Sequence, residues 1–162
     1  MNWHRAATAV LVSSGSLITG AAATLAQAHA PGSGTIRVTG PVRVIEADTL
    51  EVSVDGRRVG VGIVGIIAPP GNTDCGKQAI QFAYSLLDSG LELEEDQAVP
   101  AFDEAKRRMY RVRRLPSRES VAVAIAAAGF ANADPKAQNA IDQAEVVAAA
   151  ANARANRRGC IH

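Results

Sequence analysis

Apolar residues form three runs in the first half of the chain, over residues 42–45, 50–54 and 59–67. Short polar segments separate the runs, and this alternation is typical of consecutive strands. The Asp55-Gly56 pair favours a tight hairpin between the second and third runs, because both central residues of such a turn need positive φ. The sequence therefore predicts a three-stranded antiparallel meander that ends at Pro69-Pro70, where no backbone N–H can continue a ladder.

A helix is predicted after the meander. Asp74 can cap it, Gly90 can end it, and the apolar residues between them recur at helical spacing. Two strands follow at 91–94, where Leu and Glu alternate, and at 106–114, where Tyr110 and Val112 are the expected inward positions.

Two helices are predicted in the last third of the chain. The first spans 117–128 and is apolar on most faces, which indicates burial. Asp134-Pro135 supplies a cap and a proline at the first helical position of the second, which is expected to run to about Arg158. The pattern as a whole predicts a mainly β fold with helices (α+β), with five strands and three helices.

Residues 1–28 have the pattern of a secretory signal peptide: a basic start, an apolar stretch, and small residues at Ala26-Gln27-Ala28. The alternative is a membrane anchor, which needs about 20 predominantly apolar residues. The polar interruption at 13–16 favours a cleaved signal peptide over an anchor. We expect cleavage after Ala28, and the remaining chain would then have no contact with the membrane. Residues 29–35 are small and polar and are interpreted as a mobile leader, so 36–162 form a single domain.

Charge and cysteine content restrict the function further. Cleavage would remove Arg5 and lower the formal net charge from +1 to zero, so no global basic field attracts nucleic acid. Cys75 and Cys160 are the two cysteines, and an even count in an exported chain favours a disulfide. Two thiols without a third ligand nearby cannot complete a tetrahedral metal shell.

Three motifs in the chain resemble the staphylococcal-nuclease-like (thermonuclease) family. They are V-I-x-x-D-T-L-x-V at 44–52, V-x-I-x-G-I-x-A-P at 61–69 after the hairpin, and Cys75-Gly76 opening a helix. The resemblance covers roughly 36–162 and implies a five-stranded OB-type barrel with three helices and Ca²⁺-dependent hydrolysis of DNA and RNA. It also implies that the start of the first helix and the segment after the last lie on the same side, so that Cys75 and Cys160 can pair.

The resemblance also implies an active site with a Ca²⁺ on two aspartates, a glutamate that handles the attacking water, and two arginines. Asp48, followed by Thr49, takes the first metal position, and Arg107 takes the second catalytic arginine, four residues after the matching Asp103. The other positions fall on Gly62, Ile67 and Pro70. Calcium prefers six to eight oxygen ligands, and these positions supply one carboxylate. The sequence therefore predicts that no Ca²⁺ is bound unless other residues rebuild the site.

Six cations lie within residues 106–114. Lys106, Arg108 and Arg111 could form a local anion-binding surface for nucleic acid or another polyanion. The alternative, which we favour, is cross-strand pairing with the acidic run Glu92, Glu94, Glu95 and Asp96. Aromatic residues that could stack on bases are scarce, which weighs against single-strand nucleic-acid binding.

These observations predict an exported domain, in the bacterial periplasm or outside the cell, that is catalytically degenerate and acts as a binding or structural module. Its partner is not identified by the sequence. The alternative is a Ca²⁺-dependent nuclease with a rearranged metal site, for which Glu46, Glu95, Asp96 and Asp103 are the candidate ligands. An oligosaccharide or small-anion binder is also compatible with the fold.

Overall fold

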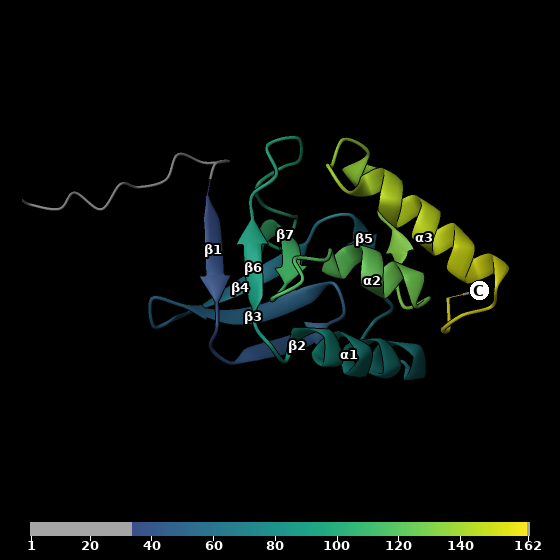
Figure 1. Ribbon diagram of the computed structural model, residues 1–162, viewed down its shortest axis with the longest axis horizontal. Helices are drawn as coiled ribbons and strands as arrows, with labels where there is room; N and C mark the ends of the chain where they lie inside the picture. Colours follow the sequence, from purple (N-terminus) through teal and green to yellow (C-terminus); the bar gives the residue numbers. More distant parts are fainter. Residues whose placement is uncertain (1–33, 162) are drawn as a thin grey trace, which may run out of the picture.

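The computed structural model describes residues 34–161, so the predicted signal peptide and most of the predicted leader lie outside the described residues. This part of the chain is α+β, with three α-helices, a mixed six-stranded sheet in the order β1-β6-β7-β4-β3-β2, and a separate β5-β8 pair (Figure 1). The strands are β1 (Thr35–Val38), β2 (Val42–Glu46), β3 (Thr49–Val54), β4 (Arg57–Ile63), β5 (Ile66–Ile67), β6 (Leu91–Glu94), β7 (Arg108–Arg114) and β8 (Asn132–Ala133). The helices are α1 (Asp74–Leu87), α2 (Val121–Ala127) and α3 (Gln143–Ala155), with a 3-10 turn η1 (Pro135–Ala137).

The predicted meander is confirmed as the antiparallel strands β2, β3 and β4. Asp55 and Gly56 have φ values of 49° and 74°, as a tight primed hairpin requires. The third predicted run does not form one strand, because Gly65 adopts a φ of +96° and turns the chain. Ile66 then pairs with Ala133 of β8 and leaves the main sheet.

The main sheet contains one strand more than the sequence predicted. β1 begins at Thr35, one residue before the expected start of the domain, and pairs with β6. A parallel ladder between β4 and β7 joins the meander to β6 and β1. The edge strands β1 and β2 are consecutive in the chain and are separated only by residues 39–41. No ladder joins them within residues 34–161, so the sheet is not a closed barrel there.

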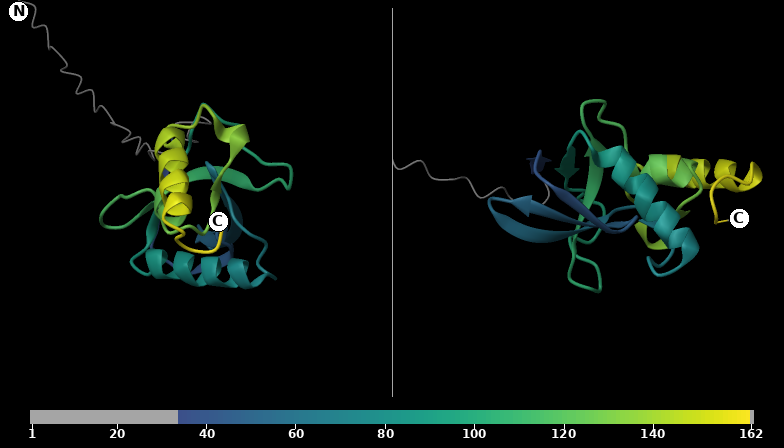
Figure 2. Two further views of the ribbon diagram at one scale, coloured as in Figure 1. Left: turned by 90° about the vertical axis from the view of Figure 1, so that its right-hand side faces the viewer. Right: turned by 90° about the horizontal axis from the view of Figure 1, so that it is seen from below.

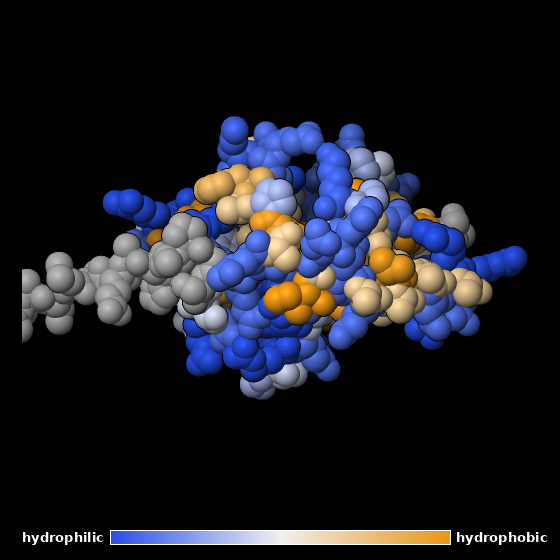
Figure 3. Space-filling view, turned by 90° about the horizontal axis from the view of Figure 1, so that it is seen from above, coloured by the Kyte–Doolittle hydropathy of each residue, from blue (hydrophilic) through white to orange (hydrophobic). Residues whose placement is uncertain are grey.

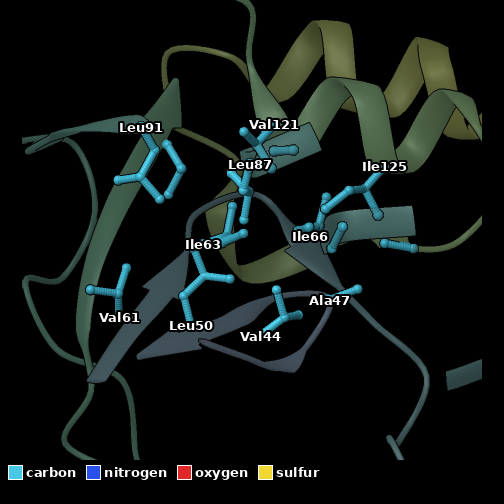
Figure 4. Close-up of a cluster of buried hydrophobic side chains, with 14 of the residues drawn as sticks. Val44, Ala47, Leu50, Val61, Ile63, Ile66, Leu87, Leu91, Val121 and Ile125 are labelled. Carbon is cyan, nitrogen blue, oxygen red and sulfur yellow. The ribbon is translucent and has the colours of Figure 1, made fainter. Parts of the chain in front are cut away.

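The core lies between this curved sheet and the helices. Figure 4 shows Leu50 and Ile63 of the strands pointing toward Leu87 of α1 and toward Val121 and Ile125 of α2. All five side chains are buried. α3 packs against α2 at the end of the molecule away from β1 (Figure 2). Alanines on α1 and α3 permit close approach of the helices, so the fold stays compact with few large side chains.

Two helix starts differ from the prediction. Thr73, rather than Asp74, caps α1, since its side chain accepts a hydrogen bond of 2.9 Å from the N–H of Gly76. Asp74 already has helical geometry and pairs with Lys77 in the first turn. α2 begins at Val121 with Ser120 as its cap, four residues after the predicted start.

The last predicted helix is interrupted. The side chain of Asp134 caps the short 3-10 turn η1 and not α3. α3 begins only at Gln143 and ends at Ala155. The interruption has a tertiary cause, because the N–H of Ile141 donates to Asp96 Oδ2 over 2.9 Å. Nε2 of Gln143 donates to the carbonyl oxygen of Asp134 over 2.8 Å, which fixes the turn. Side-chain partners thus replace the hydrogen bonds that a continuous helix would have made.

Cys75 and Cys160 form the predicted disulfide, with their Cα atoms 5.6 Å apart. It joins the first turn of α1 to the segment after α3, where the N–H of Cys160 also donates to the carbonyl oxygen of Gly129 over 3.0 Å. A disulfide is compatible with an exported protein. None of the helices in the described part of the chain is long and apolar enough to cross a membrane.

We expect the Cys75→Ser/Cys160→Ser variant to lose about 2 to 4 kcal/mol of unfolding free energy, because the bridge constrains a long loop of the unfolded chain. The measurement compares urea unfolding of the variant with that of the oxidised wild type, both without reductant. The wild type unfolded in the presence of reductant is the matched control. An unchanged midpoint in the variant would show that α3 docks without the covalent link.

Candidate functional site

Asp48 lies in the turn between β2 and β3, and both of its carboxylate oxygens accept hydrogen bonds within the protein. Oδ2 accepts from the N–H of Ala68 at 2.7 Å, and Oδ1 accepts from Oγ1 of Thr49 at 2.9 Å. Its backbone carbonyl accepts from the N–H of Ile63 at 2.8 Å. Asp48 therefore fastens the turn to β4 and to the chain after β5, which is a structural role for the carboxylate.

Arg107 is placed by a tight turn that starts at Asp103. The backbone N–H and Nε of Arg107 donate to the Asp103 carboxylate over 2.8 and 2.6 Å. Nη1 of Arg107 donates to Oγ1 of Thr49. The structure therefore brings Asp48, Thr49, Asp103 and Arg107 into one hydrogen-bonded chain. The Arg107 side chain is 36 % exposed, and its Nη2 makes no hydrogen bond within residues 34–161.

Arg107 also determines the ionisation of Asp103. Burial raises the pKa of the Asp103 carboxyl, but the backbone N–H, the guanidinium hydrogen bond and the positive charge of Arg107 together outweigh it. The net result is a pKa below the ordinary value of 3.8. Asp103 is therefore ionised at neutral pH and is the fixed partner of Arg107.

The remaining positions of the implied active site do not fit a calcium ion. Ile67 is 48 % exposed and has no lone pair to offer. Gly62 lies opposite Thr49, and the side chain of Met109 occupies the space that a Cβ at Gly62 would need. The carbonyl oxygen of Pro70 accepts from Thr73 at the start of α1. No group of three His, Cys, Asp or Glu side chains among the described residues could hold a metal ion.

The carboxylates proposed for a rearranged metal site have other partners. Glu46 accepts from the N–H of Gly71 at 3.2 Å. Asp96 is buried and accepts from the N–H groups of Ala98 and Ile141. Glu95 pairs with Arg108 and Asp103 with Arg107. The structure does not bring these four carboxylates together as a ligand set.

Arginines of β7 form ion pairs with Glu94 on the neighbouring strand β6. This confirms the predicted cross-strand pairing for Glu94. Arg111 and Arg113 both contact Glu94 Oε2, at 3.3 and 3.2 Å. The same two arginines contact Asp142 Oδ1 at 3.4 and 3.0 Å. This cluster of two carboxylates and two guanidinium groups, about 15 % exposed, fixes the start of α3 against β7.

Glu92 is paired differently from the prediction. Its side chain is only 4 % exposed and contacts Arg37 of β1 and Arg118 after β7, although Arg113 is its opposite residue in the ladder. The 2.6 Å contact between Arg118 Nη1 and Glu92 Oε1 is an ion pair without the alignment of a hydrogen bond.

The three residues suggested for anion binding, Lys106, Arg108 and Arg111, differ in their ion-pair partners. Arg108 pairs with Glu95 and lies over the rings of Phe102 and Tyr110, at 5.8 and 5.6 Å from their centroids. Arg111 is in the cluster described above, and Lys106 makes no ion pair within the described range 34–161. An anion-binding surface at these residues stays a prediction, and internal pairing accounts for most of the charge.

A pocket with a volume of about 540 Å³ lies beside Arg107. Its walls are β5, the β6–β7 connection and η1, and most of the lining residues are apolar. The β6–β7 connection projects toward the viewer in Figure 3, where hydrophobic residues gather in small groups among hydrophilic ones. The sequence did not indicate Val64, Val99, Phe102 or Lys136 as site residues. The one local signal was the apolar Pro100-Ala101-Phe102 stretch inside a polar connection.

We expect Asp103→Asn to lower the unfolding free energy by about 1 to 3 kcal/mol at neutral pH, because two hydrogen bonds to a charged group are weakened. Since the folded pKa of Asp103 lies below 3.8, its contribution is complete above that pH and is lost as the pH falls further. Urea unfolding across this range should show the difference between wild type and variant shrinking in acid. Asp88→Asn is the control, because Asp88 is exposed and makes no ion pair with any residue that the structure describes. A pH-independent difference for Asp103→Asn would contradict the assignment.

Glu94→Gln should destabilise the fold by about 3 kcal/mol, because it leaves two largely buried arginines with Asp142 as the one remaining carboxylate of the cluster. Glu51→Gln provides the matched control, since its partner Arg58 is well exposed and such pairs contribute less than about 1 kcal/mol. Chemical unfolding of both variants at one ionic strength makes the comparison. Equal effects would show that the cluster is no more than a surface ion pair.

Comparisons with known proteins do not assign the chain to a family. No protein-family model matches it, and a search of curated proteins found no match. The resemblance to the thermonuclease family therefore rests on the three sequence motifs, at 44–52, at 61–69 and at Cys75-Gly76.

Proposed function

We propose that this chain is an exported, non-hydrolytic relative of the staphylococcal-nuclease-like proteins that binds a ligand in the pocket beside Arg107. One observation carries the proposal. The retained positions Asp48, Thr49 and Arg107 form a hydrogen-bonded frame, while an apolar pocket wall, Ile67, stands where the resemblance places the second metal ligand.

The sheet supports the family part of this proposal. β1 and β2 lie at opposite edges of the sheet yet are separated by only three residues, so together they can be regarded as one interrupted strand. Counted in this way the sheet has five strands, β3, β4, β6 and β7 being the others. An OB-type barrel is a partly open five-stranded barrel, and its face is a frequent binding surface.

The chemistry of the site argues against hydrolysis. A phosphodiesterase of the thermonuclease type needs a hard cation with several oxygen ligands and fixed positive charges around the reacting phosphate. Here Asp48 accepts hydrogen bonds on both oxygens, Ile67 offers no ligand, and the place of the first arginine is taken by Met109. A Ca²⁺-dependent nuclease stays the alternative, but none of its candidate ligands Glu46, Glu95, Asp96 and Asp103 lies in a shared site.

Arg107 supports a binding role. Two of its guanidinium nitrogens hold the β6–β7 connection against the β2–β3 turn, so that they shape the pocket wall. A binding site on a fixed framework retains its shape without ligand, which lowers the entropic cost of binding. The disulfide is compatible with an exported location, which we take to be the bacterial periplasm or the cell exterior.

The test is a nuclease assay on the purified chain without residues 1–28, using single-stranded DNA with Ca²⁺, with Mg²⁺ and with a chelator. We expect no metal-dependent cleavage. Cleavage that requires the metal and disappears in a folded Asp48→Asn variant would overturn the proposal. Cleavage that is unchanged in both Asp48→Asn and Arg107→Gln would come from a contaminating enzyme.

A further inference from the structure

The pocket beside Arg107 has the size and lining of a small-molecule site. Its volume of about 540 Å³ falls within the range of about 300 to 1,000 Å³ that is typical of ligand pockets. Two large apolar side chains on its walls are unusually exposed, Ile67 at 48 % and Phe102 at 53 %. Val64 and Val99 lie deeper in the lining and extend the apolar surface inward. A ligand that covers Ile67 and Phe102 would gain about 25 cal/mol for each Å² of apolar area removed from water.

The charged residues of the lining largely neutralise one another. Arg107 is paired with Asp103, and Lys136 Nζ lies 2.8 Å from Glu104 Oε1, which links η1 to the β6–β7 connection at the rim. The remaining charged group is Asp134, whose carboxylate accepts from the N–H of Lys136. Two cations therefore face three carboxylates, and the lining carries a formal charge of −1. Such a site repels an anion more than it attracts one.

Arg107 has hydrogen-bond donors left for a ligand. Arg107 uses Nε and Nη1 for Asp103 and Thr49, and Nη2 makes no hydrogen bond to any residue that the structure describes. A guanidinium group that is held on two sides offers its remaining N–H groups in a fixed direction. It can donate to a carbonyl or ether oxygen of a ligand without attracting a second full charge, because Asp103 already neutralises it.

We propose that the pocket binds an uncharged, mostly apolar small molecule that carries one hydrogen-bond acceptor for Arg107. The inference rests on the proposed function, in that it takes the pocket to be the binding site, and adds the chemical class of the ligand. This ligand class does not include nucleotides, because a nucleotide brings two or more negative charges to a lining that has no surplus cation.

The experiment compares two fluorescent probes that differ by one charge. N-phenyl-1-naphthylamine is neutral, and 8-anilinonaphthalene-1-sulfonate is the same ring system with a sulfonate. We expect saturable binding of the neutral probe to the purified chain without residues 1–28. Its affinity should exceed that of the sulfonate by at least about tenfold, equivalent to 1.4 kcal/mol.

Matched variants locate the binding. Ile67→Asp places a carboxylate in the apolar wall and should weaken the neutral probe by about tenfold or more. Ile45→Asp makes the same change at an Ile of similar exposure on β2, outside the pocket, and should leave the affinity unchanged. Phe102→Ala should weaken binding without adding charge, which keeps the test informative if Ile67→Asp fails to fold by circular dichroism.

The acceptor is tested by competition against the neutral probe. 2-Acetylnaphthalene should displace it at a concentration at least about threefold lower than 2-ethylnaphthalene, because only the ketone accepts a hydrogen bond. This preference should disappear in Arg107→Gln.

The possible results separate the two proposals. Equal or tighter binding of the sulfonate probe, lost in Ile67→Asp, would overturn the inference and leave the pocket as a site for an anion. Neutral-probe binding that Ile67→Asp and Phe102→Ala do not change, or no binding at all, would overturn it as well. Metal-dependent nuclease activity that disappears in Asp48→Asn would overturn the proposed function whichever probe binds.

Discussion

The parallel ladder between β4 and β7 is the contact on which the rest of the architecture depends. It is the one ladder among the described strands that joins the β2–β3–β4 meander to β7, β6 and β1. Its first pair, Val61 and Arg108, sets where the preceding residue, Arg107, meets Thr49. The same strand carries Arg111 and Arg113 to Asp142 at the start of α3. A shift of this register by one residue would turn every side chain of β7 to the other face.

Polar groups in this molecule serve mainly to connect segments. Asp48 joins a turn to the end of β5, Asp96 holds the turn before α3, and Asp103 holds Arg107. Each carboxylate accepts hydrogen bonds from groups with fixed positions, which is a favourable use of a partly buried charge. Asp48, Thr49 and Arg107 belong to this hydrogen-bonded frame, and Ile67 lies in the mostly apolar lining of the pocket beside Arg107.

Local pattern was enough to predict those parts of the fold that depend on neighbouring residues. The Asp55-Gly56 hairpin, the 91–94 strand and the burial of Tyr110 and Val112 all agree with the structure. Pattern failed where the deciding partner is distant in the sequence. The break before α3 depends on Asp96, 45 residues from Ile141. The pocket was not predictable for the same reason, since its walls come from three segments that have no common period.

The position of the disulfide has a consequence for the durability of the chain. Cys75 and Cys160 enclose α1, the β6–β7 connection, η1 and α3 in one covalent loop. The exposed tip of the connection, at Glu104 to Lys106, is the kind of segment at which proteases cut. A single cut there would leave two polypeptides that the disulfide still joins and that the β4–β7 and β6–β7 ladders still align. A molecule nicked in this way would keep both halves of the pocket together.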